Sequence, residues 1–198
     1  MLLGERIRLR APERSDIPMF VRWFNDPELL RYLAMYLPMS QAAEEQWFEA
    51  QLNDSSGHVF VIETSEGVPI GNLDLFDIDS KNGQAGCGIS ICEKPYLNQG
   101  YGTDALRTLL NFAFREMNLH RVFLQVFDFN ERAIGCYEKL GFRHEARLRD
   151  AHFLEGRYVD ELIMGLLREE WEAGEGRGVA VGRQATTAAQ SPPVGDGT

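Results

Sequence analysis

The stretch KPYLNQGYGTDAL, residues 94–106, decides how this chain folds. It places Gly100 and Gly102 directly before an amphipathic run that continues to about Met117. Free N–H groups and the dipole at a helix N-terminus favour a bound phosphate, and glycines let the backbone approach such a ligand closely. The stretch therefore predicts either a phosphate-binding loop before a helix or a loop that only requires glycine conformations.

Three alternating apolar runs precede this loop. HVFVIET (58–64), VPIGNLDLFDI (68–78) and QAGCGISI (84–91) are separated by the turn signals Ser65-Glu66-Gly67 and Ser80-Lys81-Asn82-Gly83. Short alternating runs joined by such turns predict an antiparallel meander.

Further toward the N-terminus, ERIRLRAP (5–12) predicts one more strand, and Ser15-Asp16 predict the start of a short helix. Ser40 is expected to cap a second helix, whose Trp47 and Phe48 would face inward. Glu44-Glu45 of that helix are expected to be solvated charges.

On the C-terminal side, RVFLQVFD (121–128) predicts a buried strand. Asn130 is expected to cap a helix that ends at Gly141, and strands over 143–150 and 157–167 follow, joined by AHFLEG. The whole order predicts an α+β fold, with a mixed, mostly antiparallel sheet of six to seven strands flanked by helices.

Composition narrows the class of protein. The chain has 198 residues and a formal net charge of −10, which disfavours a nucleic-acid partner. No apolar run is long enough to span a membrane, and only three cysteines are present, so a reduced, cytoplasmic location is expected. Residues 1–172 are expected to form one domain, and the small and polar residues of 173–198 predict a flexible, low-complexity tail.

A dinucleotide site is the specific competitor for the glycine loop. Residues 100–105 fit the pattern G-x-G-x-x-G/A, and Asp128 would be its ribose-binding acid. That pattern belongs in a short turn near the start of alternating β and α units, whereas three meander strands precede this one. The context therefore argues against a dinucleotide site.

Five segments together resemble the GNAT superfamily of N-acetyltransferases, in family order and over about residues 4–171. They are ERIRLRAPERSDI (5–17), IGNLDLFDID (70–79), KPYLNQGYGTDAL (94–106), NERAIGCYEKLGF (130–142) and YVDELIMGLLREEW (158–171). The branch that is most similar contains ribosomal-protein N-terminal acetyltransferases and polyamine acetyltransferases. The resemblance implies the GNAT fold, acetyl-CoA as co-substrate, and no metal.

The resemblance also implies a cofactor site. The loop would hold the pyrophosphate, the end of the preceding strand would pair with the pantetheine arm, and the cap of the later helix would bind that arm from the far side. The residues concerned are Ser90, Ile91, Cys92, Leu97, Asn98, Gln99, Gly100, Tyr101, Gly102, Thr103, Asn130 and Ala133.

Tyr137 resembles the family's general acid. An amine attacks the thioester, and the departing thiolate needs a proton. A phenol, with a pKa near ~10, still holds its proton at neutral pH and is able to donate it.

Two positions depart from the family pattern. Leu97 stands where relatives often have Gln or Arg, which removes one side-chain contact to phosphate. QAGCGISI contains no carboxylate, although many relatives have a Glu on this strand. The general base is therefore open between Asp74, Asp77, His152 and ordered water.

The acceptor pocket is expected between residues 25–39 and the last hairpin, with Tyr32, Tyr36, Asp74 and His152 as candidates. LAMYLPMS (33–40) is apolar and carries none of the carboxylates that hold a polycation in polyamine-acetylating relatives. The expected acceptor is a protein or peptide N-terminal amine, or a small amine with an apolar portion. A polyamine, and a non-catalytic acetyl-CoA-binding module, are the alternatives; a homodimer is compatible with this architecture.

Overall fold

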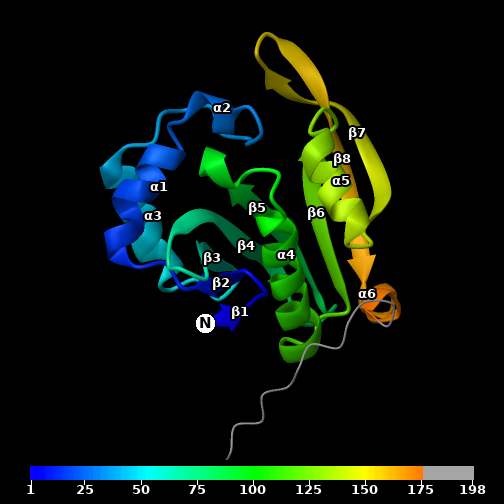
Figure 1. The fold of residues 1–198 in the computed structure, drawn as a ribbon. Coiled ribbons are helices and arrows are strands. Elements are labelled where there is room, and N and C mark those ends of the chain that lie inside the picture. Colours follow the sequence, from blue (N-terminus) through cyan, green and yellow to red (C-terminus); the bar gives the residue numbers. More distant parts are fainter. Residues whose placement is uncertain (176–198) are drawn as a thin grey trace, which may run out of the picture.

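The computed structural model of the protein describes residues 1–175, within which one sheet has the strand order β1-β2-β3-β4-β5-β6-β8-β7 (Figure 1). The strands are β1 (Leu2–Leu3), β2 (Ile7–Arg10), β3 (His58–Thr64), β4 (Pro69–Asp79), β5 (Gln84–Ile91), β6 (Arg121–Phe127), β7 (Arg143–Leu154) and β8 (Arg157–Leu167). The expected mixed, mostly antiparallel sheet is confirmed. It gains an unexpected edge strand because the short β1 folds back antiparallel on β2.

Helices connect and flank these strands. They are η1 (Arg14–Asp16), α1 (Ile17–Trp23), α2 (Pro27–Leu30), α3 (Gln41–Gln51), η2 (Lys94–Tyr96), α4 (Tyr101–Asn111), η3 (Phe112–Glu116), α5 (Glu131–Lys139) and α6 (Arg168–Glu175). Two expected caps are confirmed: the Ser40 side chain accepts from the Ala43 N–H, and the Asn130 side chain from the Ala133 N–H. The cap expected at Ser15-Asp16 is wrong, because both residues lie within η1, and the Asp16 side chain makes no cap hydrogen bond to α1. The tail expected over 173–198 falls, from residue 176 on, outside the described residues.

Three further predicted features differ from the structure. Helix α4 begins at Tyr101, so Gly102 and Thr103 lie in its first turn rather than in the loop before it. Glu44 is buried in α3 and is not a solvated charge. The segment from Ala151 to Leu154 continues strand β7, because a two-residue turn at Glu155 and Gly156, both with positive φ, already reverses the chain.

The helices cover both faces of the sheet. Leu73 and Leu75 of β4 share the main core with Leu109 of α4, whereas Phe20 of α1 packs in a second cluster with Val61 of β3. Ile62, the neighbour of Val61, belongs to the main core, so the two clusters lie on opposite faces of β3. Helices α1 and α4 therefore enclose the sheet from opposite sides, as Figure 1 shows.

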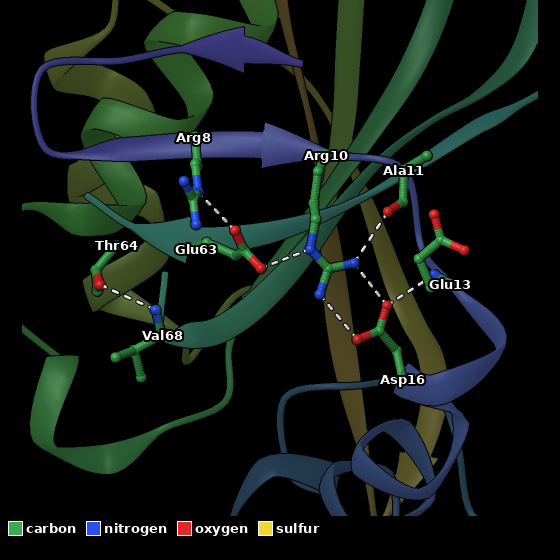
Figure 2. Close-up of polar contacts among 8 residues, drawn as sticks. All are labelled: Arg8, Arg10, Ala11, Glu13, Asp16, Glu63, Thr64 and Val68. Carbon is green, nitrogen blue, oxygen red and sulfur yellow. Dashed lines mark hydrogen bonds and ion pairs between the residues drawn. The ribbon is translucent and has the colours of Figure 1, made fainter. Parts of the chain in front are cut away.

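An ion-pair network fixes the start of the chain against β3. Glu63 accepts from the Nε atoms of Arg8 and Arg10, both at 2.6 Å, and Arg10 also donates to Asp16 at 2.6 and 2.8 Å (Figure 2). Glu63 and Asp16 are buried. Because each buried carboxylate faces a guanidinium, this network joins β2, β3 and η1 without leaving an uncompensated charge.

The sheet splits between β5 and β6. These strands are parallel, and they pair only from Gln84 to Gly86 on β5 with Arg121 to Phe123 on β6. Within the described residues, the rest of β5 pairs with β4 alone, and the rest of β6 with β8 alone. One edge of β5 is thus left open over Cys87 to Ile91, beside helices α4 and α5.

Candidate active site

A cavity of about 680 Å³ occupies the split between β5 and β6. Its wall includes the open end of β5, the loop before α4, the first turns of α4 and α5, and the segment after α1. Most of the expected cofactor residues line it, namely Ser90, Ile91, Leu97, Asn98, Gly100, Tyr101, Gly102, Thr103, Asn130 and Ala133. Tyr137 lines the same cavity.

The glycine loop has the geometry of an anion site. Gly100 is the N-cap of α4 with φ +87°, a left-handed conformation that favours glycine. The first hydrogen bond of the helix runs from the Asp104 N–H to the Gly100 carbonyl at 3.0 Å, so the N–H groups of Tyr101, Gly102 and Thr103 have no partner within the helix. Phosphate oxygens are the ligands that such N–H groups and the helix dipole favour.

Two side chains behind the loop, the buried Asp104 and the charged Arg6, were not predicted from the sequence. Asp104 accepts from the backbone N–H groups of Glu5 and Arg6, at 3.1 and 2.8 Å, and so holds the start of the chain against α4. The Arg6 guanidinium then lies 4.1 Å from the centre of the Tyr101 ring and donates to the Gln99 carbonyl. Arg6 thus brings a positive charge to a loop in which Leu97 provides none.

Cys92 and Gln99 are the expected cofactor residues that do not line the cavity. The Cys92 side chain is buried with Trp23 in the second cluster, and its N–H donates to the Ile70 carbonyl at 2.8 Å. The Gln99 side chain instead donates to the Pro95 carbonyl. Both side chains stabilise the protein's own loop ends.

Asn130 and Tyr137 approach the cavity from α5. The Asn130 oxygen accepts the Ala133 N–H at 3.3 Å, which leaves the amide NH₂ of Asn130 free to donate toward the cavity. Tyr137 is buried, its ring lies edge-on to Phe142, and burial raises its pKa. The phenol therefore keeps its proton at neutral pH, as a general acid must.

The four acceptor candidates divide into two pairs. Tyr32 and Asp74 line the cavity. Tyr36 does not, and it is 86% exposed. His152 does not line it either, but its Nε2 lies 2.9 Å from an oxygen of Glu161, which does.

Glu161 is the acceptor-side carboxylate that sequence reasoning missed. It lies on β8 opposite Phe127 of β6, and its side chain is 12% exposed. The available signal was a carboxylate within the otherwise apolar run ELIMGLL. With Asp74 it gives the cavity two carboxylates, and Arg132 and Lys139 of α5 line the cavity as well.

Three further features concern metal binding, disulfide bonds and membrane spans in the described residues. Among residues 1–175, no group of three or more His, Cys, Asp or Glu side chains is arranged to hold a metal ion. The cysteines of the chain, Cys87, Cys92 and Cys136, are all free thiols. No helix in this part of the chain is long and apolar enough to cross a membrane.

Comparisons with known proteins agree with this geometry. The acetyltransferase (GNAT) domain family matches residues 6–143. The N-acetyltransferase YokL of Bacillus subtilis is 33% identical over 174 residues, 87% of this chain and 96% of that protein. The ribosomal N-acetyltransferase YdaF of the same organism, a putative assignment in its own name, is 33% identical over 107 residues, 54% of this chain and 58% of YdaF.

A solved structure shares the fold as well. The spermidine N-acetyltransferase of Vibrio cholerae, in complex with CoA and spermine, superposes with a TM-score of 0.81 at 26% identity, covering 85% of this chain and 99% of that one. This chain thus combines the open edge of β5, the glycine cap of α4 and the buried Tyr137, and its relatives are acetyltransferases. The chain belongs to the GNAT family of acetyl-CoA-dependent N-acetyltransferases.

Proposed function

We propose that the acceptor of this acetyltransferase is a primary amine with an apolar portion, either a small molecule or the N-terminal residue of a peptide. The observation that carries the proposal is the lining of the cavity, which combines two carboxylates, Asp74 and Glu161, with the apolar side chains of Phe24, Leu29 and Met35. The carboxylates would attract the ammonium group, and the wall would hold the apolar portion.

We further propose that transfer is direct, with Tyr137 as general acid. Acetyl-CoA would bind with its pyrophosphate on the N–H groups at the start of α4 and its pantetheine arm along β5, held on the far side by Asn130. The amine nitrogen would attack the thioester carbonyl, the carbon–sulfur bond would break, and the thiolate would take the Tyr137 proton. A non-catalytic binding module would not require a buried tyrosine here.

A spermidine-type polyamine is the second candidate. It is favoured by the similarity to the spermidine N-acetyltransferase of Vibrio cholerae and by the presence of two carboxylates on the acceptor side. Against it stands the segment LAMYLPMS, residues 33–40, which places no acidic residue beside the cavity.

Two wider properties are also proposals. The free thiols of all three cysteines are consistent with a reducing, cytoplasmic location. Assembly as a homodimer is to be tested by sedimentation.

Thiol release from acetyl-CoA tests the acceptor and the acid together. The panel holds phenethylamine, spermidine, and short peptides that begin with Ala, Ser or Met. We expect turnover with phenethylamine or a peptide, and a fall of about 100-fold in Tyr137→Phe. Tyr158→Phe, a change at a residue 63% exposed on the last hairpin, is the matched control and should leave the rate unchanged. A preference for spermidine would select the second candidate, and an unchanged rate in Tyr137→Phe would remove the assigned acid.

A further inference from the structure

The reaction needs a group that takes a proton from the acceptor, and β5 supplies none. An ammonium ion has no lone pair, so it attacks a thioester only after deprotonation. Strand β5 carries no carboxylate between Gln84 and Ile91. The inference below rests on the proposed function and concerns where this base lies.

Asp74 faces the cavity from the neighbouring strand. Its neighbours Leu73 and Leu75 both point into the main core on the α4 side, so the Asp74 side chain points to the opposite face of β4. In the antiparallel register Asp74 lies directly opposite Gly88 of β5. Directly opposed residues place their side chains on the same face of a sheet, so the Asp74 carboxylate and the missing side chain of Gly88 share one space.

Gly88 is what leaves room for this carboxylate. A Cβ atom at position 88 would lie 2.6 Å from Asp74 Oδ1, closer than real Cβ contacts. Gly88 does not have a positive φ, so the space it leaves, rather than its conformation, explains the glycine. The backbone N–H of Gly88 also acts to lower the pKa of this carboxyl group. The carboxylate therefore lies across β5, beside the edge that is open toward the cavity.

The surroundings of Asp74 suit a base that works near neutral pH. Burial raises its pKa to about 6, against the opposing hydrogen bonds from the N–H groups of Gly88 and Asp74 itself. The Cys87 thiol on β5 interacts electrostatically with Asp74. The other titratable or charged side chains that line the same cavity are Tyr32, Tyr96, Tyr101, Arg132, Cys136, Tyr137, Lys139 and Glu161. Burial raises the pKa of Cys87 and of Tyr137, so both stay neutral in this range.

We propose that Asp74 is the general base of acetyl transfer and that Gly88 is its positioning residue. The ammonium gives one proton to the Asp74 carboxylate, which releases it to solvent after the turnover. The neutral amine attacks the thioester carbon, the carbon–sulfur bond breaks, and the thiolate takes the Tyr137 proton. After the attack, the nitrogen carries two protons, and it gives one of them to the Tyr137 oxygen. The products are therefore the amide, the free thiol and one proton.

The test compares four carboxylate and glycine variants over pH 5.5–9, with phenethylamine and spermidine as acceptors. We expect Asp74→Asn to lower kcat about 100-fold near pH 7. It should also abolish the rising limb of the pH profile of kcat, which has an apparent pKa of about 6. Gly88→Ala, which displaces the same carboxylate, should lower kcat and shift that limb. Asp77, the other acidic candidate on β4, is exposed and does not line the cavity, so Asp77→Asn is the matched control and should change neither. Glu161→Gln should retain the limb.

Each outcome separates the base from the wider function. If the unsubstituted enzyme turns over and Asp74→Asn keeps the limb of the pH profile, Asp74 is not the general base, while the proposed acetyl transfer is unaffected. A rise in KM alone would overturn the base too, because Asp74 would then only hold the ammonium. Bound acetyl-CoA, measured by calorimetry, without turnover of either acceptor or any peptide would overturn the base together with the proposed function.

Discussion

Glu63 on β3 and Asp74 on β4 are carboxylates on adjacent strands, and the protein treats them in opposite ways. Burial alone would raise the pKa of Glu63, but hydrogen bonds from Arg10 and Arg8 outweigh it and lower that pKa. For Asp74, the only groups that lower the pKa are uncharged backbone N–H groups. Burial outweighs them and raises the pKa of Asp74 to about 6. The first carboxylate is held ionised as part of the scaffold, whereas the second is left able to exchange a proton.

This difference teaches how one sheet can serve both stability and chemistry. Near the start of the chain, the guanidinium groups of Arg8 and Arg10 compensate the negative charges of Glu63 and Asp16. At the cavity, the two arginine-free carboxylates Asp74 and Glu161 face the space where a cationic substrate would enter. Under the proposed function, the ammonium group of the substrate would supply a positive charge next to Asp74, which has no ion-pair partner among the described residues.

The largest effect should come from breaking the compensated region. Arg10→Met leaves Asp16 without its guanidinium and Glu63 with Arg8 alone, so we expect a loss of about 3 kcal/mol in the free energy of unfolding at pH 7. Urea unfolding measures it. The loss should shrink at pH 4, where the orphaned carboxylates can take up protons.

Arg14→Met is the matched control for this variant. Arg14 pairs with Glu49 on the surface, with side chains 63% and 51% exposed, and such pairs contribute about 0–1 kcal/mol. Equal losses in the two variants would contradict the assignment of the Arg10 network as a buried, compensated unit.

The second effect has the opposite sign and belongs to Asp74. A carboxyl group whose pKa is higher in the folded than in the unfolded chain favours folding below pH 4, and that contribution is lost as the pH rises through about 6. Asp74→Asn should therefore be more stable than the unsubstituted protein at pH 8, by up to about 3 kcal/mol, and nearly equally stable at pH 4. Thermal unfolding at the two pH values checks both signs. A stability gain that does not depend on pH would mean that Asp74 is not charged in the folded protein at pH 8.

Local chemistry explains which features the sequence could predict. The positive φ of Gly100 and the capping oxygens of Ser40 and Asn130 depend on a few neighbouring residues, and all three were expected. The fold class followed because alternating runs and turn residues are likewise local signals. The split between β5 and β6 is not local, and no sequence pattern predicted it.

The carboxylate site depends on register, which sequence patterns do not fix here. Asp74 faces the cavity because it is paired with Gly88, and a slip of one residue would turn it into the core. Glu161 was missed for the same reason, since its place depends on the pairing of β8 with β6. Tyr36, expected beside the acceptor, is exposed and does not line the cavity, although its neighbour Met35 does.

Glu44 sharpens the comparison with the smallest expected effect. It lies on the α3 face that carries Phe48, is 2% exposed, and its Oε1 has no hydrogen-bond partner among the described residues. Burial raises its pKa, as for Asp74, but Glu44 does not line the cavity. Glu44→Met keeps the length of the side chain and removes the buried charge, so we expect a gain of about 1 kcal/mol at pH 8 and less at pH 4.

Glu45→Met, on the exposed side of the same helix, is the control, and urea unfolding at both pH values is the measurement. A loss of stability in Glu44→Met would show that this carboxylate makes a compensating contact, as Glu63 does. A gain in stability without loss of acetyl transfer would show that the burial of Glu44 is not needed for activity, in contrast to the role proposed for Asp74.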